Sequence, residues 1–242
     1  MRLAVISDVH GNLLALEAVH KEIKAAAPDV IVNLGDCLSA PLWPEETAQY
    51  LMAENWLTVR GNHDRWLSEQ THPHDLDDML RPELSAATMA WLAALPATAQ
   101  LGDDILLCHG SPASDEMFLL EEEGEDFLYP SKEAQVRAKL GPCDAALVLC
   151  GHSHTPRLVH MDGGPTILNP GSVGVQAFPS FTATGSPHAR FAIATRNGSS
   201  WSFTQYAIEY DWLAAAAQAE ARGQSRWVHG LTTGFAPVPD KP

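Results

Sequence analysis

The chain has 242 residues, with 15 Lys and Arg against 30 Asp and Glu, so its formal charge at pH 7 is −15. This charge argues against a general binder of nucleic acid or of anionic membranes, and no apolar run approaches the roughly 20 residues that a bilayer span requires. Residues 1–12 lack a basic segment followed by a long apolar stretch, so we expect no signal peptide and a soluble, cytoplasmic protein.

The first third of the chain alternates between strand and helix patterns. An apolar strand at residues 3–6 breaks at Ser7-Asp8, and Pro28 marks the end of the helix that follows. Four further elements are predicted here: a helix at 13–26, a strand at 30–32, a helix at about 45–54 and a strand at 57–59. Strands separated by helices favour parallel pairing in an α/β fold.

The rest of the chain returns to strands after an insertion. Residues 65–99 are predicted to be a helical insertion, and residues 114–141 a second insertion whose acidic run at 121–123 faces solvent. The later strands are predicted at 105–108, 146–149, 166–168 and 191–193. We expect the tail from about 223 to 242 to be loosely ordered. Without repeats or linker-like tracts, residues 1–242 are expected to form one domain.

Polar residues that can bind metal ions follow several of the apolar strands. The residues that stand out are Asp8, His10, Asp36, Asn62, His63, Asp64, His109, His152 and His154. Sites in open α/β sheets form at the carboxyl ends of strands, and a shared cation would satisfy Asp and His side chains that are buried there. Each element alone is weak, because Asp8 could cap a helix and the His152–His154 pair could belong to a structural loop.

The order and placement of these residues together are specific. The segments SDVHGN (7–12), GD (35–36), GNHD (61–64), HG (109–110) and GHSH (151–154) resemble the five signature blocks of the calcineurin-like metallophosphoesterases. NPGS at 169–172 resembles a segment of the small bacterial members. The resemblance implies a four-layer α/β/β/α sandwich with helical insertions and a dinuclear metal centre.

The same resemblance implies a role for each site residue. Asp8, His10 and His154 would hold one divalent ion, Asn62, His109 and His152 the other, and Asp36 would bridge them. Mixed carboxylate, imidazole and amide donors suit Mn²⁺, Fe or Zn²⁺ better than Ca²⁺; Mn²⁺ is our first choice, with Fe, Zn, Ni or Mg as alternatives. His63 would protonate the leaving oxygen or stabilise charge on the phosphoryl group. Asp64 would either orient His63 or cap a turn.

Departures from the pattern narrow the expected activity. Residues 35–40 lack the Asp-Arg pair that the phosphoprotein-phosphatase branch carries after its GD block, and GNHD stands where that branch has GNHE. Both differences favour the small bacterial phosphodiesterase-like group.

The predicted function is therefore hydrolysis of small phosphodiesters by attack of a metal-bridging hydroxide. The alternatives are a phosphomonoesterase acting on nucleotides or phosphoproteins and a non-catalytic scaffold with the same fold. The expected partner is a small phosphoester substrate. We expect no surface patch that binds nucleic acid and no association with a membrane, and the sequence is compatible with a homo-oligomer.

Overall fold

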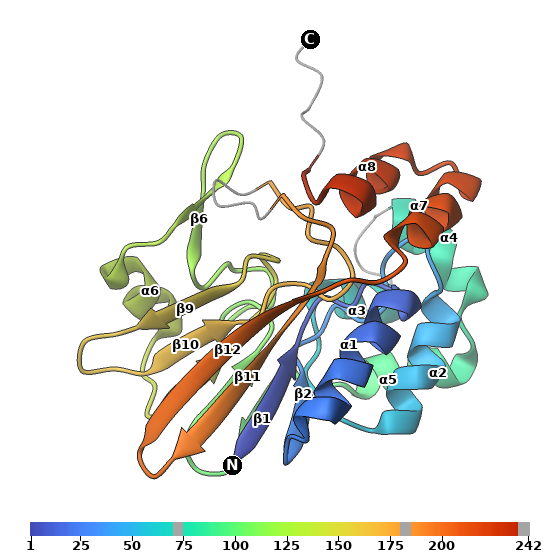
Figure 1. Ribbon diagram of the computed structural model, residues 1–242. Helices are drawn as coiled ribbons and strands as arrows, with labels where there is room; N and C mark the ends of the chain where they lie inside the picture. The colour runs from blue at the N-terminus through green and yellow to red at the C-terminus, as the bar shows by residue number, and fades with distance from the viewer. Residues whose placement is uncertain (70–74, 180–184, 237–242) are drawn as a thin grey trace.

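The computed structural model describes residues 1–69, 75–179 and 185–236, and strands and helices alternate along much of this chain (Figure 1). Two five-stranded sheets form its centre. The first contains, in spatial order, β12 (Ser200–Ile208), β11 (Ala189–Asn197), β1 (Arg2–Ile6), β2 (Val30–Asn33) and β3 (Leu57–Thr58). The second contains β4 (Thr98–Leu101), β5 (Ile105–Cys108), β8 (Leu147–Leu149), β10 (Thr166–Asn169) and β9 (Arg157–His160).

The parallel strands carry the site. Strands β1, β2 and β3 run parallel in the first sheet, as do β5, β8 and β10 in the second, while β11, β12, β4 and β9 pair antiparallel with their neighbours. Carboxyl ends of parallel strands meet at one edge of a sheet. In Figure 1 this is the edge away from the N-terminus, where the loops of both sheets come together.

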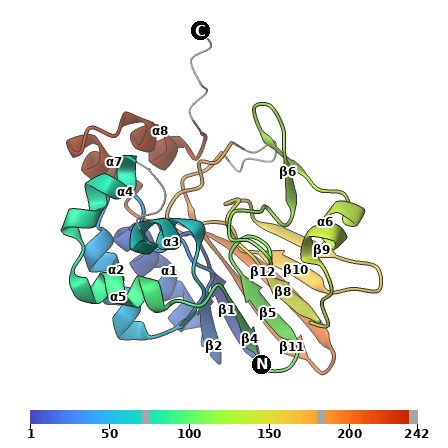
Figure 2. The same cartoon turned by 180° about the vertical axis from the view of Figure 1, so that it is seen from behind.

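Helices cover the outer faces of the two sheets. Helices α1 (Leu13–Ala26) and α2 (Pro44–Glu54) cover the first sheet, with α5 (Ala86–Ala94) beside α2. Helix α6 (Glu133–Leu140) packs on the second sheet, on the opposite side of the molecule (Figures 1 and 2). The remaining described helices are α3 (Asn62–Glu69), α4 (Asp75–Leu80), a 3₁₀ turn at Arg81–Glu83, α7 (Trp212–Ala221) and α8 (Ser225–Thr233). The predicted four-layer α/β/β/α sandwich is confirmed.

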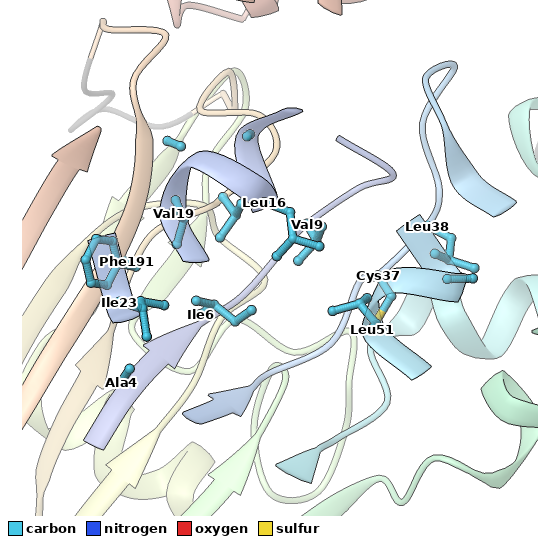
Figure 3. Packing of buried hydrophobic residues seen from close by; sticks show 14 of the residues in the cluster. Ala4, Ile6, Val9, Leu16, Val19, Ile23, Cys37, Leu38, Leu51 and Phe191 are labelled. Atoms are coloured by element: carbon cyan, nitrogen blue, oxygen red, sulfur yellow. The ribbon is translucent and has the colours of Figure 1, made fainter. Parts of the chain in front are cut away.

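The alternation of side chains along β1 produces these layers. Leu3 and Val5 point into a cluster shared by both sheets, whereas Ala4 and Ile6 point into the cluster beneath α1. Figure 3 shows this second cluster. Its residues from α1 lie on one face of that helix: Leu16, Val19 and Ile23. Each such side chain stabilises the fold by roughly 1.5–3 kcal/mol through removal from water.

Three expectations outside the site need correction. Residues 114–141 are not wholly helical, because a hairpin of β6 (Glu121–Glu123) and β7 (Leu128–Pro130) precedes α6. The acidic run does not simply face solvent: Glu121 is 2% exposed, and its carboxylate lies 3.6 Å from the guanidinium of Arg157. The tail is not loosely ordered throughout, because Ser225–Thr233 is α8, which packs on α7.

The first insertion, at 65–99, is helical through α3, α4 and α5, and its last residues begin β4. Its histidines at 72 and 74 lie outside the described residues. In the part of the chain that is described, no helix combines the length and apolar character needed to cross a membrane.

Candidate metal centre

Five loops at the carboxyl ends of β1, β2, β3, β5 and β8 bring together all seven residues predicted as metal ligands. The ligand atoms of Asp8, His10 and His154 lie within 4.8 Å of one another, and those of Asp36, His109 and His152 do likewise. Asn62 joins the second group, because its Oδ1 lies 3.1 Å from Nε2 of His109. These are two adjacent clusters of the kind that each hold one ion.

Two carboxylates connect the clusters. Oδ2 of Asp36 lies 3.2 Å from Nε2 of His109 and 3.8 Å from Nε2 of His10, so it faces both groups, as a bridging ligand must. Oδ1 of Asp8 lies 3.4 Å from Nε2 of His154 and 3.9 Å from Nε2 of His109. The centre is therefore continuous rather than two separate sites.

Each of the four histidines also contacts a backbone carbonyl with its other ring nitrogen. The contacts are Nδ1 of His10 with Ser39 (2.9 Å), Nδ1 of His109 with Leu34 (2.7 Å), Nδ1 of His154 with Val175 (2.7 Å), and Nε2 of His152 with Glu116 (3.0 Å). A carbonyl accepts only, so each of these ring nitrogens is the donor, and the remaining nitrogen of the neutral ring presents a lone pair. Such carbonyl contacts orient metal-binding histidines in proteins.

The close approach of two histidine nitrogens shows that a metal ion fits the centre. Nε2 of His10 and Nε2 of His154 lie 3.1 Å apart, and both rings have already given their N–H to a carbonyl. Two acceptors at this distance repel unless a proton or a cation lies between them. The donor set of imidazoles, carboxylates and one amide oxygen therefore fits divalent transition metals.

Backbone strain is concentrated at the same residues. Among the described residues, seven other than glycine have positive φ, and two of them, Ala27 and Asn55, terminate α1 and α2. The other five are all predicted ligands: Asp8 (55°), His10 (48°), Asp36 (54°), His152 (68°) and His154 (53°). The left-handed region is unfavourable for such side chains, costing on the order of 1–3 kcal/mol each. Apart from the two helix ends, this strain lies only at ligand positions among the described residues, which indicates that the fold is organised around the centre.

For four of the seven ligands, the electrostatics match the protonation states that metal binding needs. Burial opposes ionisation of Asp8 and Asp36, but the imidazoles of His154 and His109 beside them hold both pKa values below the usual range for Asp. Burial lowers the pKa of His10, and burial beside His109 lowers the pKa of His152 to about 4. At neutral pH these two carboxylates are ionised and these two imidazoles neutral.

His63 and Asp64 follow Asn62 at the start of α3 but have different surroundings. The half-buried ring of His63 lies at the pocket wall, 4.7 Å from the ring of Trp66, while its backbone N–H donates to Oδ1 of Asp36 at 3.0 Å. Asp64 is fully buried. Its carboxylate accepts backbone N–H bonds from Asp36 (2.9 Å), Cys37 (2.8 Å) and Gly61 (2.9 Å).

These contacts favour the turn-capping role of Asp64 over a role in orienting His63. The carboxylate joins the loop after β2 to the loop after β3, and so fixes Asp36 next to Asn62. Burial and the charge of Asp36 raise the pKa of Asp64 to about 7. Ionisation of this carboxyl group is therefore unfavourable, and the backbone N–H donors offset part of that cost.

A pocket of about 920 Å³ opens over the centre. Six of the nine predicted site residues line it: His10, Asp36, Asn62, His63, His152 and His154. Sequence reasoning missed the other groups in its wall, above all Trp66, Phe178, Arg226 and Trp227. The last two lie on α8, where the spacing of Trp227, Val228 and Leu231 is a weak signal of an amphipathic helix.

The two packed sheets, their flanking helices and the paired His/Asp clusters define a metallophosphoesterase fold. The family model described as the calcineurin-like phosphoesterase superfamily domain matches residues 1–192, and the chain belongs to this superfamily.

Two relatives illustrate the likeness. The crystal structure of a metallophosphoesterase from Sphaerobacter thermophilus is 25% identical, with a TM-score of 0.76 over 97% of this chain and all of that one. An uncharacterized protein of Methanocaldococcus jannaschii is 27% identical over 181 residues, which are 71% of this chain and 69% of that protein.

Proposed function

We propose that this chain is a phosphodiesterase that hydrolyses small diesters with two divalent ions held by Asp8, His10, Asp36, Asn62, His109, His152 and His154. The observation that carries the proposal is the pair of ligand clusters at the floor of a pocket of about 920 Å³. When bound, a pair of metal ions polarises a phosphoryl group and lowers the pKa of an attacking water.

The chain's own residues supply the remaining functions. The half-buried imidazole of His63 faces the pocket and is the group we assign to protonate the leaving oxygen. The backbone N–H of His63 donates to Oδ1 of Asp36 and so orients this carboxylate. Its Oδ2 is left directed toward His10 and His109, as a bridging ligand requires. Asp64 maintains this arrangement by binding both loops.

The wall of the pocket favours diesters over monoesters. Trp66, Phe178 and Trp227 bring three aromatic rings, from α3, the 175–179 loop and α8, around the metal-binding face. A phosphodiester carries an organic group on each side of phosphorus, so it can use apolar surface in two directions, whereas a monoester can use it in one. The pocket size is within the roughly 300–1,000 Å³ typical for small-molecule sites.

The first test compares two chromogenic substrates on the Mn²⁺-loaded full chain, bis(4-nitrophenyl) phosphate and 4-nitrophenyl phosphate. We expect a kcat/KM at least 10-fold higher for the diester, with Asp36→Asn as the control for contaminating activity. Higher kcat/KM for the monoester would establish the phosphatase alternative, and no turnover of either would favour the scaffold. Parallel loading with Fe, Zn, Ni or Mg tests the choice of manganese.

The second test concerns size and charge. A chain of charge −15 should repel long polyanions, so we expect poor hydrolysis of duplex DNA and long RNA at low ionic strength. If long nucleic acid were the better substrate, and lost this advantage as salt rose, the small-diester assignment would be wrong.

A further inference from the structure

The last two helices lie beyond the part of the chain that the family model matches, and they stand over the metal centre. In Figures 1 and 2, α7 and α8 sit at the sheet edge where the ligand loops converge. Their buried residues form one apolar cluster with the loops that follow β2 and β10: Ala40, Leu42, Val175, Ala215, Ala216, Ala219 and Leu231. These two loops also supply the Ser39 and Val175 carbonyls that orient His10 and His154.

Close packing fixes α8 at this position. Gly230 is buried, and a Cβ added to it would meet Cβ of Ala177 at 2.7 Å, so the helix rests directly on the pocket-lining 175–178 segment. Gln218 of α7 donates a hydrogen bond to the carbonyl of Leu42 at 3.3 Å. The pair of helices is therefore a built wall of the pocket rather than a loose tail.

This wall carries a cation. Among the residues that the structure describes, Arg226 is the one Lys or Arg side chain that lines the pocket, in a chain whose net charge is −15. The guanidinium of neighbouring Arg222 donates two hydrogen bonds to Glu83, at 2.7 and 2.9 Å. Arg226, in contrast, forms no salt bridge with any described carboxylate, and it is an exposed residue of the pocket wall.

Next to this cation lies an aromatic surface. The ring of Trp227 is 6.2 Å from the ring of His10, and the ring of Phe178 is 4.9 Å from that of His154. A substrate whose phosphorus lies at the metals is therefore next to these aromatic rings, and Arg226 lines the same pocket.

We propose that Arg226 binds a second anionic group of the substrate, on the organic portion away from the scissile phosphodiester, while Trp227 packs against that portion. The inference rests on the proposed function and narrows it to small diesters that carry an additional phosphate or carboxylate. The guanidinium is a cation with paired N–H donors, whose geometry matches either oxyanion. Arg226 is thus a specificity-determining residue contributed by the C-terminal helices.

The test uses three aryl 4-nitrophenyl phosphates that share one leaving group and differ only at the para position of the second ring: hydrogen, carboxylate or phosphonate. The Mn²⁺-loaded wild type should show a kcat/KM about 10–100-fold higher for the charged diesters at low ionic strength, since a hydrogen bond to a charged group contributes roughly 1.5–3 kcal/mol. Carboxylate and phosphonate arms distinguish the two oxyanions.

Variants at Arg226 locate the preference. Arg226→Ala should reduce the charged-to-neutral ratio of kcat/KM to near one, and Arg226→Lys should retain part of it. Arg222→Ala, the matched control directly after α7, should leave the ratio as in the wild type. A wild type without preference, or an Arg226→Ala variant that keeps the ratio, would overturn the inference.

A binding measurement separates this inference from the proposed function. Diphenyl phosphate and its 4-carboxy derivative lack an activated leaving group, so calorimetry can compare their Kd values directly. Tighter binding of the charged ligand that disappears in Arg226→Ala supports the subsite even if no diester is hydrolysed. Hydrolysis without any charge preference in binding or turnover would reject the subsite alone.

Discussion

The substitution Gly61→Ala tests how the fold positions Asp36. Gly61 precedes the ligand Asn62, and its N–H donates to Asp64. A Cβ at Gly61 would lie 2.1 Å from Oδ1 and 2.5 Å from the backbone nitrogen of Asp36. Because carbon and oxygen atoms rarely approach closer than about 3 Å, the carboxylate or its loop must move by roughly 0.9 Å.

The size of the effect follows from this displacement. A misplacement of about 1 Å in a catalytic constellation costs roughly 10²-fold in rate. Overpacking a tight site costs about 1–3 kcal/mol, and 1 kcal/mol shifts Tm by about 2–4 °C in a protein of this size. We therefore expect Gly61→Ala to lower kcat/KM about 10²-fold and the Tm of the metal-free protein by about 2–12 °C.

The control is Gly102→Ala, in the turn between β4 and β5. It has φ +63°, and no atom lies within 4 Å of an added Cβ. The free energy of unfolding of this variant should fall by about 1 kcal/mol because of backbone strain, while its activity and metal content stay unchanged. Diester kinetics, elemental analysis and thermal melts of both variants complete the assay. If Gly61→Ala kept two tightly bound ions and full activity, close packing of Gly61 on Asp36 would not be what positions the carboxylate.

Further predictions concern single side chains of the centre. Asp36→Asn should weaken both metal sites because it removes an anion facing both clusters, and elemental analysis that still finds two tightly held ions would contradict this. His63→Ala should lower kcat about 10²–10⁴-fold with metal content near two; loss of an ion would make His63 a ligand. Although burial opposes protonation of His109, Asp36 raises its pKa to about 10 in the metal-free fold, so metal binding at pH 8 should release a proton. Calorimetry in buffers of different ionisation enthalpy measures this release, and a value of zero would refute it. The raised pKa of His109 also stabilises the metal-free fold. This stabilisation is fully present below pH 6.5, the pKa of His in the unfolded chain, and it is lost as the pH rises through about 10. The Tm of the metal-free protein should therefore fall over that interval, and His109→Gln should flatten the slope.

The ligand residues were predictable because they follow apolar strands along the chain. Short apolar runs such as β1 and β8 are followed closely by polar residues, and parallel strands place such ends at one sheet edge. The helix at 13–26 followed from its own sequence pattern, whereas the four-layer arrangement was implied by the resemblance to the metallophosphoesterases. The roles of the residues around the ligands were harder to predict from the sequence, and Asp64 illustrates why. Its partners are three backbone N–H groups. Every residue type except proline carries such a group, so no sequence motif identifies these partners.

Local pattern thus determined the α/β class and the candidate site residues, because apolar strand segments and the residues that follow them are properties of short stretches of sequence. The tertiary structure alone decided what surrounds them. Glu121 is buried although it lies in an acidic run, because β6 places it beside Arg157. Arg226 reaches the pocket because α8 packs against a segment some 50 residues earlier in the chain. Such long-range neighbours are selected by the packing of whole elements, and a short stretch of sequence does not encode its distant partners.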